Sequence, residues 1–356
     1  MDLYAKKVFS IIYEQMSLFP GEGFDNNSML NTDNVDIDSN IISTRLLEAF
    51  SISDIPFFNC DFDTIYPKIA AALPSEQIVF NDLNINSLIA SETICAAICH
   101  QMNWDFLRKA VQEKTRCNPE WLSEDALSII SDDDVRSLLK GYNRIERIRE
   151  KERANMLRQI GMLAKSHNGF TWLFFDSGMH LLSEEELREN LLQCPVFSND
   201  PEEKKLQLLL QKLSNYPQFA ELSNYCKPAI DYHLIRCFLR RGLVFPRTKL
   251  GVEFISSAET QRKESTVGAL RLLCSSLIQE ISCFTNLTIN SVNQIEWYVG
   301  RSICKEGTPD CFLVDLDASW ARNNFTRCPF FSTCCAINSN SELLCIDEPT
   351  YLGNSY

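Results

Sequence analysis

The sequence predicts an all-α protein. Apolar residues recur at helical spacing through most of the chain from Leu88 onward. No alternation of strands with helices indicates a parallel sheet, and no internal repeat is evident. With 356 residues, of which 45% are hydrophobic, the chain can bury a large core and has the length of two domains.

The expected helices follow one another with short breaks. A first helix over 3–17 precedes a polar loop rich in Asn and Asp over 26–40. The stretch 87–102 is apolar on most faces, which suits a buried helix, and it ends in the polar residues His100 and Gln101, close to Trp104. Further helices are expected over 123–130, 131–141, 144–165, 184–193, 202–215, 267–281 and 290–304, with one more after Asp231.

Charge and targeting signals narrow the class of protein. The net charge of -13 argues against a protein that coats nucleic acid, although the acid excess is mostly N-terminal: residues 1–85 carry 4 basic and 13 acidic side chains, and residues 86–241 carry 21 and 22. No positively charged leader precedes an apolar stretch, and no uninterrupted apolar run approaches the length of a membrane span. We expect a soluble, cytoplasmic monomer in a reducing compartment, with no membrane association.

The segment from Lys227 to Gly242, KPAIDYHLIRCFLRRG, is the first candidate for chemistry. Asp231 stands at the expected N-cap of a helix, where backbone amides and the helix dipole keep a carboxylate ionised at neutral pH. An ionised carboxylate can serve catalysis. It can equally be a plain helix cap, because Asp is common at that position.

Four cysteines form the second candidate. Cys304, Cys311, Cys328 and Cys334 have the spacing C-x6-C-x16-C-x5-C and follow directly on an expected helix. Four thiolates that converge on one point can hold an iron–sulfur cluster or a tetrahedral zinc ion. Cys335 is an alternative to Cys334, and chance clustering is the competing interpretation, since the chain has fifteen cysteines.

These two segments resemble the endonuclease III-like helix-hairpin-helix DNA glycosylases. The family has an iron–sulfur loop of pattern C-x6-C-x2-C-x5-C after a helix that ends in Gly-Arg, which Gly300 and Arg301 match, and the sixteen residues between Cys311 and Cys328 are then an insertion. The family's catalytic segment, PxxVDxHxxRxxxRLG, is similar to PAIDYHLIRCFLRRG. In that alignment Asp231, His233 and Arg236 match its aspartate, histidine and arginine.

Other matches follow in the same order along the chain. Gln101 resembles the family's gap-filling glutamine, and 141–143 and 167–169 resemble its GLY(N) and HNG turns. The family's Schiff-base lysine falls near Lys204 or Lys205. One departure concerns the hairpin itself, which in the family uses glycines to bring backbone amides to a DNA phosphate, whereas this chain reads CPVFSNDPEEKK and has none there.

The resemblance implies a two-lobed glycosylase-like fold with a 4Fe–4S cluster, or zinc, on Cys304, Cys311, Cys328 and Cys334. Its parts would be an acidic segment over 1–87 that packs on the C-terminal lobe, a helical core over 88–226, and a C-terminal lobe over 227–356. The implied activity is removal of a damaged or modified DNA base, with Asp231 and Lys205 as catalytic residues, Lys205 also giving lyase activity. Substrate contacts would come from Gln101, Trp104, His233 and Arg236.

Two other functions remain open at this point. The substrate can be a modified nucleoside or an RNA base, which would suit an acidic protein without the glycine hairpin. Alternatively, the chain is a non-catalytic iron–sulfur module that binds nucleic acid or protein, with Asp231 only a cap.

Overall fold

The computed structural model describes residues 49–52, 62–74, 79–80, 82–200, 202–246, 248, 251, 260–338 and 341–345. Helices account for most of these residues and strands for very few, so the all-α prediction is confirmed. The chain divides into two compact units: unit 1 combines the chain up to Pro74 with 230–352, and unit 2 is formed mainly by 75–229. The expected boundaries were 87/88 and 226/227. The helix expected over 3–17 lies outside the described residues.

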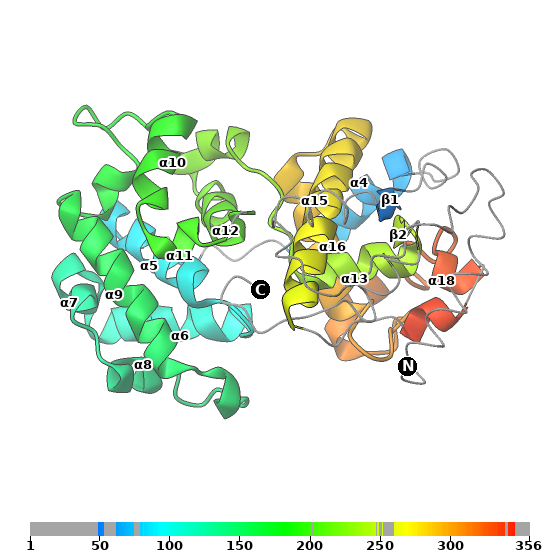
Figure 1. Ribbon diagram of the computed structural model, residues 1–356, viewed down its shortest axis with the longest axis horizontal. Helices are drawn as coiled ribbons and strands as arrows, with labels where there is room; N and C mark the ends of the chain where they lie inside the picture. Colours follow the sequence, from blue (N-terminus) through cyan, green and yellow to red (C-terminus); the bar gives the residue numbers. More distant parts are fainter. Residues whose placement is uncertain are drawn as a thin grey trace, which may run out of the picture. The chain divides into compact units, whose positions relative to one another are not determined.

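Unit 2 is built around one buried helix, α5 (Ile85–Ile98), as Figure 1 shows. Its residues from Leu88 to Ile98 are all buried, which agrees with a sequence that is apolar on every face. It contacts α6 (Trp104–Cys117), α9 (Glu150–Ser166) and α12 (Lys204–Leu213). The remaining helices of the unit are α7 (Glu124–Ser128), α8 (Asp132–Leu138), α10 (Glu184–Leu192) and α11 (Pro195–Ser198).

Unit 1 pairs chain segments that are far apart in sequence. Helix α4 (Phe62–Ala72) packs on α15 (Thr260–Thr285) and α16 (Ile289–Ser302), and α13 (Tyr232–Arg241) packs on α15 and α16. Strand β1 (Phe50–Ile52) pairs antiparallel with β2 (Val244–Pro246), a small sheet that the sequence did not predict. Two short helices, α17 (Ser319–Arg322) and α18 (Cys335–Asn338), lie in the C-terminal loops.

A buried ionic network joins three of these helices. Arg241 on α13 donates two hydrogen bonds of 2.8 Å to the carboxylate of Glu296 on α16, and Tyr66 on α4 also donates to that carboxylate. All three side chains are buried. The guanidinium of Arg241 also lies 3.7 Å from the ring centre of Phe330 in the cysteine loop. The network therefore fixes α4, α13, α16 and the cysteine loop against one another.

Several expected helix boundaries were wrong. The helix expected over 144–165 begins at Glu150, and 145–147 form a 3-10 turn, because Arg149 takes a left-handed conformation with φ 48°. Helix α5 stops at Ile98, before the polar residues that were expected to close it. The helix expected over 202–215 begins at Lys204, and α15 is longer than the expected 267–281.

One stretch of α15 has the length and hydropathy of a membrane span. Val267–Thr285 has a mean hydropathy of 1.3, and 44% of it is buried within the structure. The expectation that no apolar stretch approaches the length of a membrane span was therefore wrong for this helix. It contains Arg271, which is itself buried. A core helix of a soluble protein passes the same test, so the stretch is weak evidence for a membrane protein.

Candidate functional site

Asp231 is the N-cap of α13, as its sequence predicts. Its Oδ1 accepts hydrogen bonds from the backbone amides of His233 (2.9 Å) and Leu234 (3.3 Å), and its side chain is largely buried. No hydrogen bond from the described residues reaches Oδ2. One oxygen therefore anchors the carboxylate at the positive end of the helix while the other keeps its lone pairs for a further partner.

His233 and Arg236 lie in the contact between α13 and α16. Arg236 donates from Nε to the carbonyl of Cys304 (2.7 Å) and from NH2 to the carbonyl of Gly300 (3.0 Å), and the same NH2 lies 2.9 Å from His233 Nδ1. A Cβ on Gly300 would come within 2.7 Å of the His233 carbonyl oxygen, so the two helices need glycine there. These contacts hold Asp231's helix against the first cysteine.

The four predicted cysteines lie together. The charge of Cys304 raises the pKa of Cys311, Cys328 and Cys334, after the larger effect of burial, and the Cys328 amide donates to the Cys311 carbonyl at 2.8 Å. Backbone amides also point at the sulfurs: those of 336 and 337 at Cys334, and that of 330 at Cys328. Amide hydrogen bonds of this kind favour thiolates and tune the sulfur ligands of iron–sulfur clusters.

Cys304 is the most acidic of the four. A hydrogen bond with Cys237, together with the charges of Arg240 and Arg236, outweighs burial and lowers the pKa of Cys304 to about 6. Arg240 NH1 lies 3.8 Å from its sulfur and 2.7 Å from the carbonyl of Lys305. Sequence reasoning missed Cys237. The available signal was its position on α13, one turn after His233, on the face that meets α16.

Cys334 lies with the other three predicted thiols, since its charge and theirs shift one another's pKa values. The sulfur of Cys335 lies 2.6 Å from where a Cβ on Gly242 would stand, and Gly242 has the left-handed φ of 73° that ends α13. Cys335 thus packs on the end of α13.

The thiols do not converge on a single ion. Among the described residues, no group of three or more His, Cys, Asp or Glu side chains is arranged to hold one metal ion. A zinc ion binds each sulfur at about 2.3 Å and so requires close convergence. A 4Fe–4S cluster binds each thiolate through a different iron, which holds the sulfurs further apart, and four nearby thiols with amide donors suit it better.

Lys205 is buried in the first turn of α12. It is 2% exposed, and the hydrogen bond found for its amine is to the Met156 sulfur on α9, at 3.6 Å. Burial lowers the pKa of Lys205 to about 8, with the charges of Lys204 and Arg153 acting in the same direction and those of Cys99 and Glu152 opposing. A lysine with such a pKa is partly neutral at physiological pH, which a nucleophilic amine requires.

The loop between α5 and α6 carries the other predicted residues of unit 2. Gln101 has the left-handed φ of 54°, and Trp104 opens α6 with Lys212 Nζ 5.5 Å from its ring centre. Arg153 is fully buried: it donates to the carbonyls of Ile98 (3.1 Å) and His100 (2.7 Å), and to those of 147 and 148. These hydrogen bonds of Arg153 hold the loop between α5 and α6 against α9.

His100 is the residue of this loop that sequence analysis did not assign to the site. Its side chain is 2% exposed, and its Nε2 lies 3.0 Å from Glu152 Oε1, outside good hydrogen-bond alignment. Burial lowers the pKa of His100 to about 3, so the ring is neutral. The signal in the sequence was a titratable side chain at the end of an otherwise apolar helix.

The loop between α11 and α12 contains a buried carboxylate, that of Asp200. Asp200, 2% exposed, accepts from the amides of Glu202 (3.1 Å) and Lys204 (3.0 Å) at the start of α12. Glu203 has a left-handed φ of 51° and pairs through both oxygens with Arg188. Asp200 thus occupies one amide of the first turn of α12, that of Lys204, together with the amide of Glu202 just before the helix, and its charge disfavours an external anion there.

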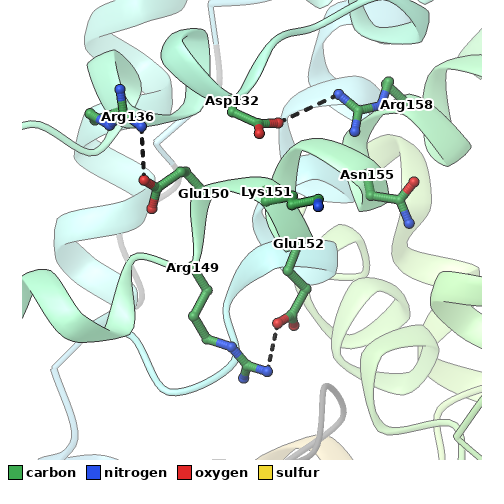
Figure 2. A pocket seen from close by; sticks show the side chains of 8 residues that line it. All are labelled: Asp132, Arg136, Arg149, Glu150, Lys151, Glu152, Asn155 and Arg158. Atoms are coloured by element: carbon green, nitrogen blue, oxygen red, sulfur yellow. Dashed lines mark hydrogen bonds and ion pairs between the residues drawn. The ribbon is translucent and has the colours of Figure 1, made fainter.

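A charged pocket of about 610 Å³ opens along the start of α9 (Figure 2). Ion pairs join Arg136 to Glu150, Arg149 to Glu152, and Arg158 to Asp132 across it. None of the residues predicted for the site lines this pocket. Its lining residues are Asp132, Arg136, Arg149, Glu150, Lys151, Glu152, Asn155 and Arg158.

A comparison with protein-family models and with curated protein sequences finds no match to this chain. Function has to be argued from the side chains just described.

Proposed function

We propose that the chain is an N-glycosylase of the base-excision type, with Asp231 as the carboxylate that stabilises positive charge on the sugar. The supporting observation is that Arg236 and Arg240 bond Asp231's helix directly to the backbone around Cys304. The two segments that carry the resemblance, far apart in sequence, thereby form one assembly with four clustered thiols.

Asp231 has the electrostatics that the reaction needs. As a base leaves, charge grows on the anomeric carbon and ring oxygen of the sugar, and a nearby carboxylate stabilises that state and can orient a water for attack. Oδ1 is held by two amides while Oδ2 remains for the substrate side. The target base must leave its stack to reach such a group. Gln101 and Trp104 are the candidates for filling the gap that it leaves.

Lys205 supplies a second mode of attack. Its partly neutral amine can add to the anomeric carbon, and the resulting imine permits cleavage of the strand. A lysine-dependent glycosylase would therefore also be a lyase.

The four thiolates suit a 4Fe–4S cluster, held by Cys304, Cys311, Cys328 and Cys334. Bound there, the cluster would supply structural support and no step of base removal, since its ligands brace α13 and the loop that follows α16. Zinc is the alternative group for the same thiols.

A second substrate class, a modified nucleoside or an RNA base, is favoured by one observation. The carboxylate of Asp200 accepts from the amides of Glu202 and Lys204 at the start of α12, where the resemblance expects a DNA phosphate. Glu202 in the same turn adds negative charge, whereas the charge of Glu203 is compensated by Arg188. A protein with this hairpin would hold a DNA backbone weakly, and binding of a free nucleoside needs no such grip.

The deciding experiment is release of free base, scored by chromatography, from a panel of damaged duplexes and modified nucleosides. Asp231→Asn is the matched variant, because asparagine caps a helix as well as aspartate but carries no charge. Base release by the parent and none by the folded variant supports the proposal. Equal turnover by both, or no release from any substrate, overturns it and leaves the non-catalytic iron–sulfur binding module.

A further inference from the structure

The segment between Cys311 and Cys328 displays a group of exposed apolar side chains. Phe312, Val314 and Leu316 are 70%, 78% and 77% exposed, although all three are large and apolar. Single apolar residues are normal on a protein surface, whereas several together mark a site of interaction. These three residues are called the apolar patch below. The resemblance to glycosylases does not account for them, because they belong to the insertion that separates this cysteine loop from that of the family.

The backbone that carries the apolar patch is held by a buried carboxylate. Oδ1 of Asp310 accepts a hydrogen bond from the amide of Val314 (2.9 Å), and Oδ2 accepts one from the amide of Asp315 (2.8 Å). The amide of Asp310 in turn donates to the carbonyl of Ile303 at 2.7 Å, and Leu313, between two exposed residues, is buried. The patch is therefore presented by a fixed backbone, which lowers the entropy that binding costs.

An aromatic ring and an arginine extend the apolar patch. The rings of Phe312 and Phe331 have their centres 5.6 Å apart, and the guanidinium of Arg327 lies 4.4 Å from the ring centre of Phe331. Aromatic side chains and arginine are enriched at protein–protein interfaces, where a few such residues contribute most of the binding energy. The composition and the fixed backbone of this surface thus favour binding of another protein.

Charge indicates the class of partner. Asp315 and Asp317 stand on either side of Leu316 in the sequence, and Asp317 is exposed without an ion pair among the described residues. The amine of Lys305 is paired with Asp315, and Arg327 adds one positive charge against a net charge of -13 for the whole chain. Nucleic acids and anionic membranes are bound largely through Lys and Arg, so the carboxylates disfavour both. They complement a protein surface on which Lys or Arg borders an apolar groove.

We propose that the apolar patch is a docking surface for a partner protein, in which Phe312, Val314 and Leu316 enter an apolar groove that is bordered by Lys or Arg. Asp317 then faces the basic border of that groove. The inference goes beyond base removal and does not depend on it, since no residue of the patch takes part in the chemistry proposed above.

The test selects binding sequences from a phage-displayed library of random peptides. The library is panned on immobilised full-length protein, and an excess of the soluble double variant Phe312→Ser, Leu316→Ser removes peptides that bind elsewhere. The recovered peptides should combine apolar residues with Lys or Arg. Synthetic copies should bind the parent about tenfold more tightly than the double variant in fluorescence anisotropy, because truncation of interface anchors usually costs at least about 1–2 kcal/mol.

A matched variant tests whether any exposed apolar residue has the same effect. Phe284 on α15 is also a large apolar residue at the surface, 50% exposed, and Phe284→Ser should bind the same peptides with parental affinity. Thermal denaturation establishes that the variants are folded, which their exposed positions favour. If the double variant is unfolded, the charge variant described next tests the proposal without it.

Asp317→Lys separates the classes of partner by the sign of its effect. It should weaken binding of the recovered peptides, because the basic border of the groove then meets a lysine. Binding of an anionic partner should instead become stronger. Parent and variant are therefore also titrated with a fluorescent DNA duplex and with phosphatidylserine vesicles. Binding of either by the parent that becomes stronger in Asp317→Lys overturns the proposal in favour of a nucleic acid or a membrane.

Other outcomes also overturn the proposal. Failure to recover peptides that prefer the parent over the double variant shows that the apolar patch is not a docking surface. Recovered peptides without Lys or Arg show that the stated chemistry of the partner is wrong. A parental dimer in sedimentation velocity that the double variant disperses makes a second copy of this chain the occupant. None of these results bears on base release, which is measured separately.

Discussion

Replacing Arg241 with methionine should destabilise unit 1 strongly. Arg241 is 4% exposed and gives two hydrogen bonds of 2.8 Å to Glu296, which is 0% exposed. Methionine fills the space of the aliphatic part of the arginine side chain but has no guanidinium. The substitution therefore removes the positive charge while it leaves the carboxylate of Glu296 and the hydroxyl of Tyr66 buried together.

The expected loss is about 3–5 kcal/mol in the free energy of unfolding, the usual cost of leaving one partner of a buried ion pair unpaired. The contact of the guanidinium with Phe330, at 3.7 Å from the ring centre, contributes on the order of 1–2 kcal/mol of this. The double variant Arg241→Met, Glu296→Met should recover most of the loss, because apolar replacement of a whole buried pair is often close to neutral.

Urea denaturation at pH 7, followed by circular dichroism, measures both variants against the parent. A single variant within about 1 kcal/mol of the parent would show that Glu296 is not an uncompensated charge, and the reasoning would fail. A double variant as unstable as the single one would assign the loss to packing and not to charge.

Four shorter predictions follow from other sites. Asp231→Asn should keep the free energy of unfolding within about 0.5 kcal/mol of the parent while base release disappears, since either residue caps α13. A large loss of stability would make Asp231 structural. Anaerobically purified protein should be brown, and Cys328→Ser should lose colour and solubility together; colourless parent with one zinc per chain by elemental analysis would replace the cluster by zinc. The pKa of Lys205 is about 8 in the folded chain and about 10.4 when unfolded, so between these pH values the unfolded state binds the extra proton and the free energy of unfolding rises with pH. Lys205→Met should remove this rise and add about 2–4 kcal/mol to the free energy of unfolding at pH 7. Thermal denaturation at pH 7 and pH 10 measures both effects. Binding to an unmodified duplex should be weak and fall steeply with salt in mobility-shift assays, and nanomolar affinity at physiological salt would contradict the engagement of the hairpin amides by Asp200.

The features that sequence predicted were local ones. The apolar pattern of α5 and the cap at Asp231 each depend on residues within one or two turns, and both occur in the structure. The cysteine spacing also predicted a grouping, because a loop of sixteen residues closes at little more cost than a short one. The two-lobed glycosylase-like arrangement of these helices is a finer statement than the all-α class, and it remains a proposal.

The predictions that were wrong or missing concern contacts between segments that are distant in the sequence. The helix expected over 144–165 starts late because Arg153 takes the carbonyls of Arg147 and Ile148 for its guanidinium, so these carbonyls serve a buried charge and not a helical turn. The contact of Cys237 with Cys304 could not be predicted from the sequence, because only the packing of α13 on α16 brings the two thiols together.

The division of the chain has a consequence for synthesis on the ribosome. Unit 2 is almost continuous in sequence, whereas unit 1 is interrupted by it. As the chain emerges, α5 can collapse with α9 and α12 soon after the last of these is made, but Tyr66 must wait for Arg241 and Glu296, more than 170 residues later. During that interval the apolar face of α4 lacks its partners and is open to chaperones. Folding of unit 1 should therefore lag behind translation, and truncation before α16 should yield a folded unit 2 with an N-terminal segment that is sensitive to protease.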